Sequence, residues 1–297
     1  IPHIGPPVKR RGGDDFILPD FYPLAVERVR MVGEGVAFVV AETLADAMDG
    51  ADLVVVDFKP LTGSAQTASA LQDGTPVIWP DIGNNEALVH EIGDKIATEE
   101  AFAKADHVVQ QRFNINRVLG NAMEMRACLA IHDPRTDHYT LRAPVQHPWA
   151  VRKILSSAII GVDELNIRVI APDVGGSFGI KANVYPEYLM ALFAARETGH
   201  PVKWTSERTE GFLSDFHARD NIADAALALD KDGNFMGFRL HNRVNIGAYF
   251  SPIGSGPATN NLGTLSGVYT TPAAYVEVVG VFTNSHPTAP YRGAGRP

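Results

Sequence analysis

The chain has 297 residues, of which 45% are hydrophobic and 20% charged, so it is long enough for a sizeable core and for two domains. This composition excludes a disordered chain, a collagen-like fibre and a small disulfide scaffold. A net charge of −8 with dispersed basic residues argues against nucleic-acid binding, and no apolar stretch reaches the roughly 20 residues of a membrane span. The single cysteine, Cys128, cannot form an internal disulfide, which favours a cytoplasmic protein.

Both ends of the sequence have the character of internal segments. The chain begins with Ile1-Pro2-His3, without an initiator methionine or a signal-peptide pattern. It ends on the glycine-rich stretch 293–297, which is typical of a loop inside a domain. We therefore expect a fragment, or one piece of a split protein.

A β-α-β unit is predicted within the first 60 residues. Gly35–Ala41 and Leu53–Phe58 are rich in β-branched and aromatic residues and are expected to be strands. Between them, Thr43 can cap a short helix that runs to Met48, and Gly50 is expected to stop it.

Two stretches lack any periodicity. Residues 1–23 are predicted to form a surface lead-in, and residues 60–93 suit a linker that wraps over a surface. We therefore expect a domain boundary between residues 75 and 95.

The strongest pattern lies after residue 138, where predicted strands alternate with predicted helices. The strands are expected at residues 139–145, 165–171 and 201–205. One helix is expected from Pro148 to Gly161 and another from Pro186 to Thr198, each with a proline at its start. This alternation predicts a parallel β-α-β-α-β unit whose strands place their carboxyl ends at one edge of the sheet.

An antiparallel section is predicted next. Ile222–Leu229 and Phe235–Ile246 flank the turn signal Asp230–Asn234, which predicts a hairpin. Gly254–Gly267 is expected to be a long loop and Val276–Phe282 a further strand. The predicted fold class is α/β, and α+β overall, with a β-α-β-α-β unit followed by an antiparallel section.

The candidate site lies at two of the predicted strand ends. Gln146 follows one strand, and the loop 174–179 (VGGSFG) follows the next. Its three glycines allow the backbone to approach a ligand and to point N–H groups at an anion or a metal oxo group, and the Gln146 amide can donate to the same group. The alternative is a tight turn needed for packing, with Gln146 as a surface residue.

Charged residues elsewhere give weaker signals. Arg292 and Arg296 lie among glycines and suit an anionic group, and the alternative is an exposed loop or a pair with a distant carboxylate. Glu124 and Arg126 are interpreted as a structural ion pair.

Several common motifs are missing from the sequence. The ten histidines show no HExxH-type spacing, and Cys128 has no neighbouring ligand, so zinc or an iron–sulfur cluster held by this chain is not supported. A Rossmann-like nucleotide enzyme is disfavoured because G-x-G-x-x-G is missing. A metal used by this chain would therefore arrive inside a cofactor.

Three motifs together resemble one family. Residues 173–181 (DVGGSFGIK), 201–208 (PVKWTSER) and 289–297 (APYRGAGRP) resemble the molybdenum-binding large subunit of the xanthine dehydrogenase and aldehyde oxidase family, especially its carbon monoxide dehydrogenase-like branch. Residues 23–43 look like the end of the family's α/β hammerhead domain, and residues 121–127 (NAMEMRA) also fit. The resemblance is collinear over nearly the whole chain.

The resemblance implies a division into domains. Residues 1–75 match the C-terminal part of the hammerhead domain, residues 76–105 a linker, and residues 106–297 the N-terminal part of the molybdenum cofactor-binding domain. The family's glutamate general base lies in a further region, so we expect this chain alone to be incomplete as a catalyst.

The resemblance also implies roles for individual residues. Gln146 resembles the glutamine that hydrogen-bonds an oxo ligand of molybdenum. Gly176 and Phe178 resemble the loop beside the metal, whose aromatic ring forms a wall of the substrate pocket. No residue is expected to bind the metal directly. The expected cofactor-binding set is Gln146, Gly175, Gly176, Ser177, Phe178 and Gly179.

The substrate pocket is expected to include Phe178, Ala182 and Arg292. Arg292 resembles the arginine that stabilises negative charge on the substrate, a catalytic role that it would share with Gln146. Ala182 stands where purine oxidisers carry a glutamate, and Gly293 stands where carbon monoxide dehydrogenases carry the cysteine that holds copper. These departures favour an aldehyde or an aromatic N-heterocycle as substrate.

The predicted function is that of part of a molybdenum hydroxylase, a molybdopterin-dependent oxidoreductase that adds water-derived oxygen to carbon. The resemblance implies molybdopterin, commonly as the cytosine dinucleotide in bacteria, and a remaining molybdopterin-binding region or chain. It also implies partner chains with 2Fe-2S clusters and FAD, because this chain lacks the cysteines for a cluster. The alternative is a non-catalytic cofactor-binding or assembly module of the same fold.

Overall fold

A computed structural model describes residues 1, 9–13, 18–158, 162–260 and 262–294, and it confirms a mixed α/β protein. The chain forms two compact units that interleave in sequence. The main segments of the first unit are Asp20–Thr62 and Leu119–Phe216, and those of the second are Gly63–Val118 and His217–Pro297. Within the described residues, no helix combines the length and the apolar character needed to cross a bilayer.

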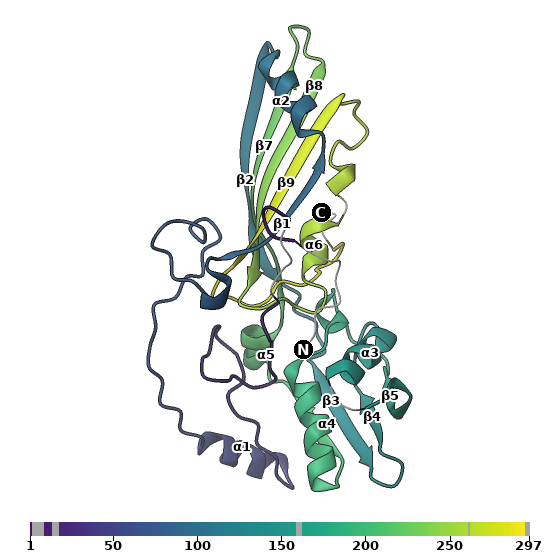
Figure 1. Cartoon of the computed structure of the whole chain (residues 1–297). Coiled ribbons are helices and arrows are strands. Elements are labelled where there is room, and N and C mark those ends of the chain that lie inside the picture. The colour runs from purple at the N-terminus through teal and green to yellow at the C-terminus, as the bar shows by residue number, and fades with distance from the viewer. Residues whose placement is uncertain (2–8, 14–17, 159–161, 261, 295–297) are drawn as a thin grey trace. The chain divides into compact units, whose positions relative to one another are not determined.

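The first unit contains a four-stranded sheet (Figure 1). Its strands, in spatial order, are β5 (Ile167–Ile170), β4 (His138–Arg142), β3 (Ala127–Asp133) and β6 (Val202–Thr205). β4 and β5 pair in parallel, as predicted, but β3 lies between β4 and β6 and is antiparallel to both. The three predicted strands therefore run in one direction, as expected, but the sheet is not purely parallel, because the short turn at residues 134–137 adds β3 as an antiparallel strand.

The predicted helices of this unit are present. α4 (Pro186–Thr198) packs on β3, β4 and β6, and it ends at Gly199 in the left-handed conformation, with φ of 69°. α3 (Pro148–Ala158) packs on β5, while its expected terminator Gly161 lies outside the described residues. α5 (Arg208–Ser214) and two short 3-10 helices, Glu164–Asn166 and Ile180–Ala182, complete the unit.

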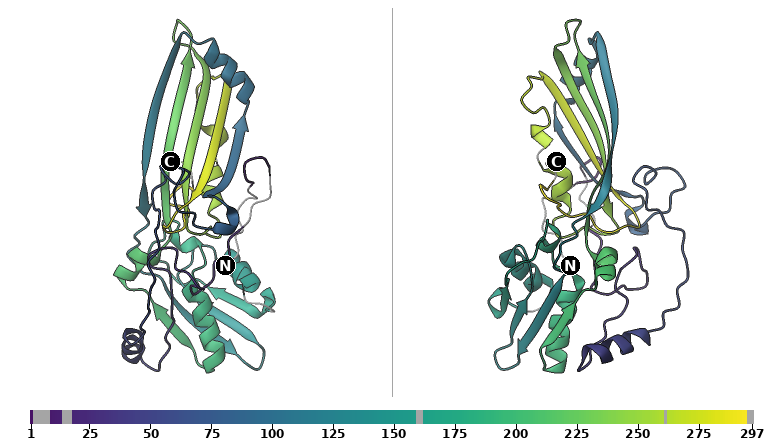
Figure 2. Two further views of the ribbon diagram at one scale, coloured as in Figure 1. Left: turned by 60° about the vertical axis from the view of Figure 1, so that its left-hand side comes forward. Right: turned by 180° about the vertical axis from the view of Figure 1, so that it is seen from behind.

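The predicted β-α-β unit near the N-terminus is wrong in its strands. α1 (Leu44–Asp52) is present, and the Thr43 hydroxyl caps it by accepting a hydrogen bond of 3.1 Å from the Asp46 N–H. Residues 35–41 and 53–58, by contrast, run as a chain without strand pairing, and Gly50 does not stop the helix (Figure 2). A β-rich sequence needs a neighbouring strand for its backbone hydrogen bonds, and the described residues offer none here.

The second unit contains a five-stranded sheet. Its spatial order is β1 (Glu86–Gly93), β9 (Ala273–Phe282), β8 (Phe235–Gly247), β7 (His217–Leu229) and β2 (His107–Leu119). β7 and β8 form the predicted antiparallel hairpin, and β9 confirms the last predicted strand. β8 and β9 pair in parallel, while β1 and β9 are antiparallel.

Several elements of this unit lie where the sequence predicted none. The predicted linker contains β1 and the 3-10 helix Pro80–Ile82, and the predicted long loop contains α6 (Ser255–Thr259) and the 3-10 helix Leu262–Thr264. β2 and the adjoining α2 (Lys95–Ala103) are further additions. β2 escaped prediction because most of its side chains are exposed and show no clean alternation of buried and exposed positions.

The five-stranded sheet is apolar on one side. Leu240, Val244, Val276 and Val278 pack there against Ala258 of α6. α2 packs on β8 and β9, and a Cβ on Gly237 of β8 would come within 3.0 Å of the Ala101 methyl group. The glycine therefore permits the close approach of α2 to the sheet.

A buried guanidinium connects the elements of the first unit. The Arg126 side chain is fully buried and makes two hydrogen bonds to Glu187 of α4, at 2.8 and 3.1 Å. Its Nε donates to Asp215, its Nη2 donates to Ser214 at 2.8 Å, and its guanidinium carbon lies 3.8 Å from the Tyr185 ring centroid. Burial raises the pKa of Asp215, and the positive charge of Arg126 opposes this shift. The start of β3, the start of α4 and the end of α5 are thus held by one cation.

We expect Arg126→Met to lower the free energy of unfolding by about 3–5 kcal/mol, because it leaves two carboxylates near the core without their counter-charge. Urea unfolding at neutral pH measures the change. The matched control is Arg196→Met, since Arg196 forms a solvent-exposed pair with Glu197, and a loss of at most about 1 kcal/mol is expected there. Equal losses in the two variants would contradict this account of the core.

Candidate functional site

Gln146 lies between the end of β4 and the start of α3, and it is hydrogen-bonded to the glycine-rich loop and to Lys181. Its backbone N–H donates to the Lys181 carbonyl at 2.9 Å. Its side-chain Oε1 accepts a hydrogen bond of 2.7 Å from the Ser177 hydroxyl. The structure therefore brings Gln146 and the loop together, as the shared strand edge predicts.

Ser177 determines the shape of the loop. Its Oγ donates to Gln146 and accepts from the backbone N–H of Lys181 at 3.1 Å and of Gly179 at 3.4 Å. Gly176 and Gly179 on either side have φ of 99° and 111°, a region open to glycine but strained for other residues. The two glycines allow the tight turn, and the serine hydroxyl holds it closed.

Phe178 occupies the centre of this turn. It has φ of 56°, which is unusual for an aromatic residue, and its side chain is 48% exposed. Backbone strain of this kind persists where the surrounding contacts impose it, and it is frequent at ligand sites. Phe178 is thus an exposed residue of the glycine-rich loop whose backbone is held in a conformation that is rare for an aromatic residue.

Glu124 ties the loop to the segment before β3. Its carboxylate accepts from the Gly175 N–H at 2.8 Å and from the Lys181 ammonium at 2.7 Å, and its own N–H donates to the Gly175 carbonyl at 3.1 Å. A Cβ on Gly175 would lie 2.6 Å from the Glu124 Cβ, so only glycine fits. Desolvation raises the pKa of Glu124, but Lys181 and the Gly175 N–H outweigh it and hold this pKa below its ordinary value.

Three hydrogen-bond donors of the site remain available to a ligand. Within the described part of the chain, the Gln146 side-chain nitrogen and the backbone N–H groups of Gly176 and Ser177 make no hydrogen bond. Together they form a set of uncharged donors suited to an acceptor-rich group, such as an oxo ligand or an anion. Among the described residues, no group of three or more His, Cys, Asp or Glu side chains could hold a metal ion.

Ala182 and Arg292 occupy different settings from the loop. Ala182 ends the 3-10 helix Ile180–Ala182 and is 7% exposed, so its methyl group contacts protein, and its place in the substrate pocket stays a prediction. Arg292 belongs to the second compact unit, where it is exposed in a turn and has φ of 38°. Its catalytic role also stays a prediction, and Arg296 lies outside the described residues.

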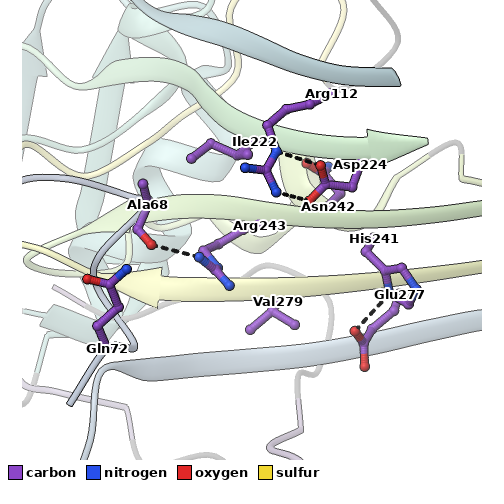
Figure 3. Close-up of a pocket in the computed structure, with 10 residues that line it drawn as sticks. All are labelled: Ala68, Gln72, Arg112, Ile222, Asp224, His241, Asn242, Arg243, Glu277 and Val279. Atoms are coloured by element: carbon purple, nitrogen blue, oxygen red, sulfur yellow. Dashed lines mark hydrogen bonds and ion pairs between the residues drawn. The ribbon is translucent and has the colours of Figure 1, made fainter. Parts of the chain in front are cut away.

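A depression of about 340 Å³ lies on the five-stranded sheet and is lined mainly by polar and charged residues (Figure 3). Arg112 makes two hydrogen bonds to Asp224, at 2.6 and 2.9 Å, and His241 lies 3.2 Å from Glu277. The Arg243 guanidinium donates to the Ala68 carbonyl at 2.8 Å. The charges of this depression are therefore largely satisfied by one another, and none of the predicted site residues lines it.

The sequence did not reveal that Glu124 forms an ion pair with Lys181 at the site. The structural role predicted for Glu124 and Arg126 is correct, but they do not pair with each other. Glu124 pairs with Lys181 and Arg126 with Glu187 and Asp215, which lie 57 to 89 residues away in the sequence. No local pattern could have identified these partners.

Comparison with known proteins identifies one family model and several similar proteins. Residues 78–297 match the family model of the molybdopterin cofactor-binding domain. The chain is 35% identical over 273 residues to the 6-hydroxypseudooxynicotine dehydrogenase complex subunit gamma of Paenarthrobacter nicotinovorans, a match that covers 92% of this chain and 34% of that protein. It is 34% identical to the carbon monoxide dehydrogenase large chain of Afipia carboxidovorans, over 88% of this chain and 34% of that one.

A solved structure is similar over nearly the whole chain. The structure of quinoline 2-oxidoreductase from Pseudomonas putida 86 matches with a TM-score of 0.88 at 32% identity, covering 99% of this chain and 37% of that one. The chain therefore spans about a third of the length of the relatives that it matches.

We expect Glu124→Gln to destabilise the protein at pH 7 by about 1–3 kcal/mol, because the fully buried Lys181 ammonium loses its counter-charge. The pKa of Glu124 is lowered on folding, so its contribution is complete above the ordinary pKa of 4.5 and is lost as the pH falls through the lowered value. The difference between variant and wild type should therefore shrink in acid. Urea unfolding at a series of pH values measures it, with exposed Glu197→Gln as control. A difference that does not change with pH would contradict the ion pair.

Proposed function

The chain belongs to the molybdopterin cofactor-binding family, in the xanthine dehydrogenase and aldehyde oxidase type of large subunit, and from this we propose that it is part of a molybdenum hydroxylase. The observation that carries the proposal is the set of donors at one strand edge: the Gln146 amide and the N–H groups of Gly176 and Ser177. An uncharged donor set fits a molybdenum centre that enters with its own ligands and presents oxo groups to the protein. The residues present therefore fit the cofactor.

The molybdopterin cofactor, when bound, supplies the redox chemistry by which water-derived oxygen is added to a substrate carbon. The protein's own contribution is to bind and to orient. Ser177 donates to Oε1 of Gln146, so the amide NH₂ group is the part of this side chain that would donate to an oxo ligand of the bound cofactor. Phe178 provides an exposed aromatic wall against which a flat substrate can pack. Arg292 is proposed to stabilise negative charge that develops on the substrate.

The proposed substrate is an aldehyde or an aromatic N-heterocycle. Three relatives that are 32 to 36% identical to the chain are named for nicotine, hydroxypseudooxynicotine and quinoline, and these names support a heterocycle. Gly293, in place of the copper-holding cysteine, argues against carbon monoxide as the substrate. Ala182, in place of a glutamate, argues against a purine.

The proposed partners follow from the route that the electrons must take. Relatives are named as the large chain or gamma subunit of a complex, which supports assembly with other chains. We propose that these carry 2Fe-2S clusters and FAD, since this chain has one cysteine and its thiol is buried, with a pKa raised by desolvation to about 12. The cofactor is proposed to be the cytosine dinucleotide form.

Metal and cofactor analysis of the protein purified with its natural partners tests this proposal. Molybdenum, iron and flavin together with turnover of an aldehyde or heterocycle are expected. Molybdopterin without turnover of any substrate would instead favour a non-catalytic cofactor-binding or assembly module. Absence of molybdenum from the purified complex would overturn the proposal.

Gln146→Ala removes one donor to the oxo group but leaves the N–H groups of the loop in place. We therefore expect the assembled enzyme to retain most of its molybdenum while kcat falls by about 10- to 1000-fold, the scale of a lost preorganised donor. Metal content and steady-state kinetics measure the two effects. The control is Gln110→Ala, an exposed residue of β2 in the second unit. Unchanged kcat in the Gln146 variant would remove this residue from the catalytic machinery.

Arg292→Met keeps the length of the side chain and removes its charge. If the charge stabilises an anionic transition state, kcat and the apparent affinity should both fall, with kcat/KM reduced by about 10- to 1000-fold. A neutral aldehyde should suffer less than a heterocycle or a carboxylated substrate. If kcat/KM is unchanged for every substrate, Arg292 is a structural residue of its turn.

A further inference from the structure

The start of β7 contains two consecutive residues in an unusual conformation. Arg219 and Asp220 have φ of 66° and 70°, in the left-handed region, although neither is glycine. Such a backbone persists only where the surrounding contacts impose it. Hydrogen bonds of the Asp220 side chain hold the backbone in this conformation, and the conformation in turn positions the Arg219 side chain.

Asp220 is held by three hydrogen bonds from three different parts of the second unit. Its carboxylate accepts from the Thr67 hydroxyl at 2.6 Å, from Nε of Arg117 at 2.8 Å and from the Asn245 amide at 3.0 Å. Thr67 and Asn245 are themselves buried, at 4% and 0% exposure. The network fixes the position of Asp220 and with it the left-handed turn of the chain.

The same network reaches the segment that follows β9. Arg117 donates to the His286 carbonyl at 3.0 Å and to the Ser285 hydroxyl at 2.8 Å, while it also donates to Asp220. Burial lowers the pKa of Arg117, and the Asp220 charge opposes this shift, so the guanidinium serves as a charged link. Residues 219–220 and residues 285–286 are therefore anchored to one side chain.

Beyond Ser285 the chain is fixed to the neighbouring strands by its backbone. The Ala289 N–H donates to the His217 carbonyl at 2.7 Å, the His217 N–H to the Pro287 carbonyl at 3.1 Å, and the Thr288 N–H to the Ile246 carbonyl at 3.0 Å. These bonds end at Ala289. Pro290 follows, and Tyr291 and Arg292 then lie in the turn, where a catalytic role is proposed for Arg292.

The Arg219 side chain contacts the turn that follows Ala289. Its guanidinium carbon lies 5.5 Å from the centroid of the Tyr291 ring, and it forms no ion pair within the described part of the chain. A guanidinium at this distance from an aromatic ring makes a cation–π interaction. The strained backbone, held by Asp220, thus places a cation against the residue that precedes Arg292.

We propose that Arg219 is a positioning residue, which acts through the Tyr291 ring to hold the turn that carries Arg292. The inference rests on the proposed function of Arg292, but the physical contact on which it depends can be tested separately. A cation–π contact of this kind contributes a factor of about 2- to 30-fold to an equilibrium. We expect the turn to loosen by that factor when the contact is removed.

Hydrogen exchange measured by mass spectrometry tests the contact without any need for activity. In the protein purified with its natural partners, Arg219→Met should increase exchange about 2- to 30-fold in peptides covering residues 287–294, with little change elsewhere. Tyr291→Leu should give the same local increase, and combining both changes should add little to either one. Tyr291→Phe retains the ring, so in that background Arg219→Met should still increase exchange in these peptides.

Arg239→Met is the matched control. Arg239 also lies over an aromatic ring, at 4.4 Å from the Phe102 centroid, and pairs with Glu99, but it has no contact with the turn. This variant should leave exchange in residues 287–294 unchanged. Unchanged exchange in the Arg219 and Tyr291 variants, or additive effects in the double variant, would overturn the proposal.

Kinetics then show whether the position of the turn matters for catalysis. Arg219→Met should reduce kcat/KM about 2- to 30-fold for a carboxylated or heterocyclic substrate and less for a neutral aldehyde, and Arg219→Lys should restore part of the loss. In the background of Arg292→Met the change at Arg219 should have no further effect. An equal loss for all substrates and in both backgrounds would overturn the positioning role. If no substrate is turned over at all, the proposed function fails, and the exchange result still decides whether Arg219 holds the turn.

Discussion

The buried cation of Arg126 is the interaction on which the first unit depends. A guanidinium removed from water requires partners for its charge and its donors, and these come from α4 and from the end of α5. Two residues earlier, Glu124 forms a separate ion pair with Lys181 and accepts from the Gly175 N–H. The short segment 124–126 is therefore held to the sheet-covering helices at one end and to the glycine-rich loop at the other. These ion pairs of Arg126 and Glu124 fix the segment against which the glycine-rich loop is held.

In the second unit, a network of polar side chains holds separate segments of the chain together. Its sheet has an apolar face covered by helices, and apolar packing alone is not directional. The hydrogen bond between Arg117 and Asp220 is directional, because a charge-assisted hydrogen bond fixes both the distance and the orientation of the two side chains. They connect the start of β7 with the segment after β9, at the level where the chain leaves the sheet. In both units a polar network thus fixes the backbone next to a segment for which a role is proposed, the glycine-rich loop in the first unit and the turn of Arg292 in the second.

The elements that the sequence predicted well are those whose signals are local. α4 begins at a proline and ends at a glycine, and its bounds agree with the prediction. The β7–β8 hairpin follows from the turn signal at residues 230–234. Residues 35–41 and 53–58 have the composition of strands but no strand pairing, whereas β2 has exposed side chains and yet pairs with β7. Strand formation depends on a hydrogen-bonding partner, and a window of sequence does not contain that partner.

The sequence by itself determined the family resemblance, the glycine-rich loop and the pairing of Gln146 with that loop. Parallel strands that follow one another through helices must bring their carboxyl ends to one edge, so this proximity was encoded in the order of the elements. The tertiary structure alone decided which charges meet. Lys181 reaches Glu124 across 57 residues, and Arg117 reaches Asp220 across 103, because a buried charge is stabilised by whichever opposite charge the fold brings within hydrogen-bond distance. Sequence spacing carries no information about such contacts, since they arise from packing between elements and not within them.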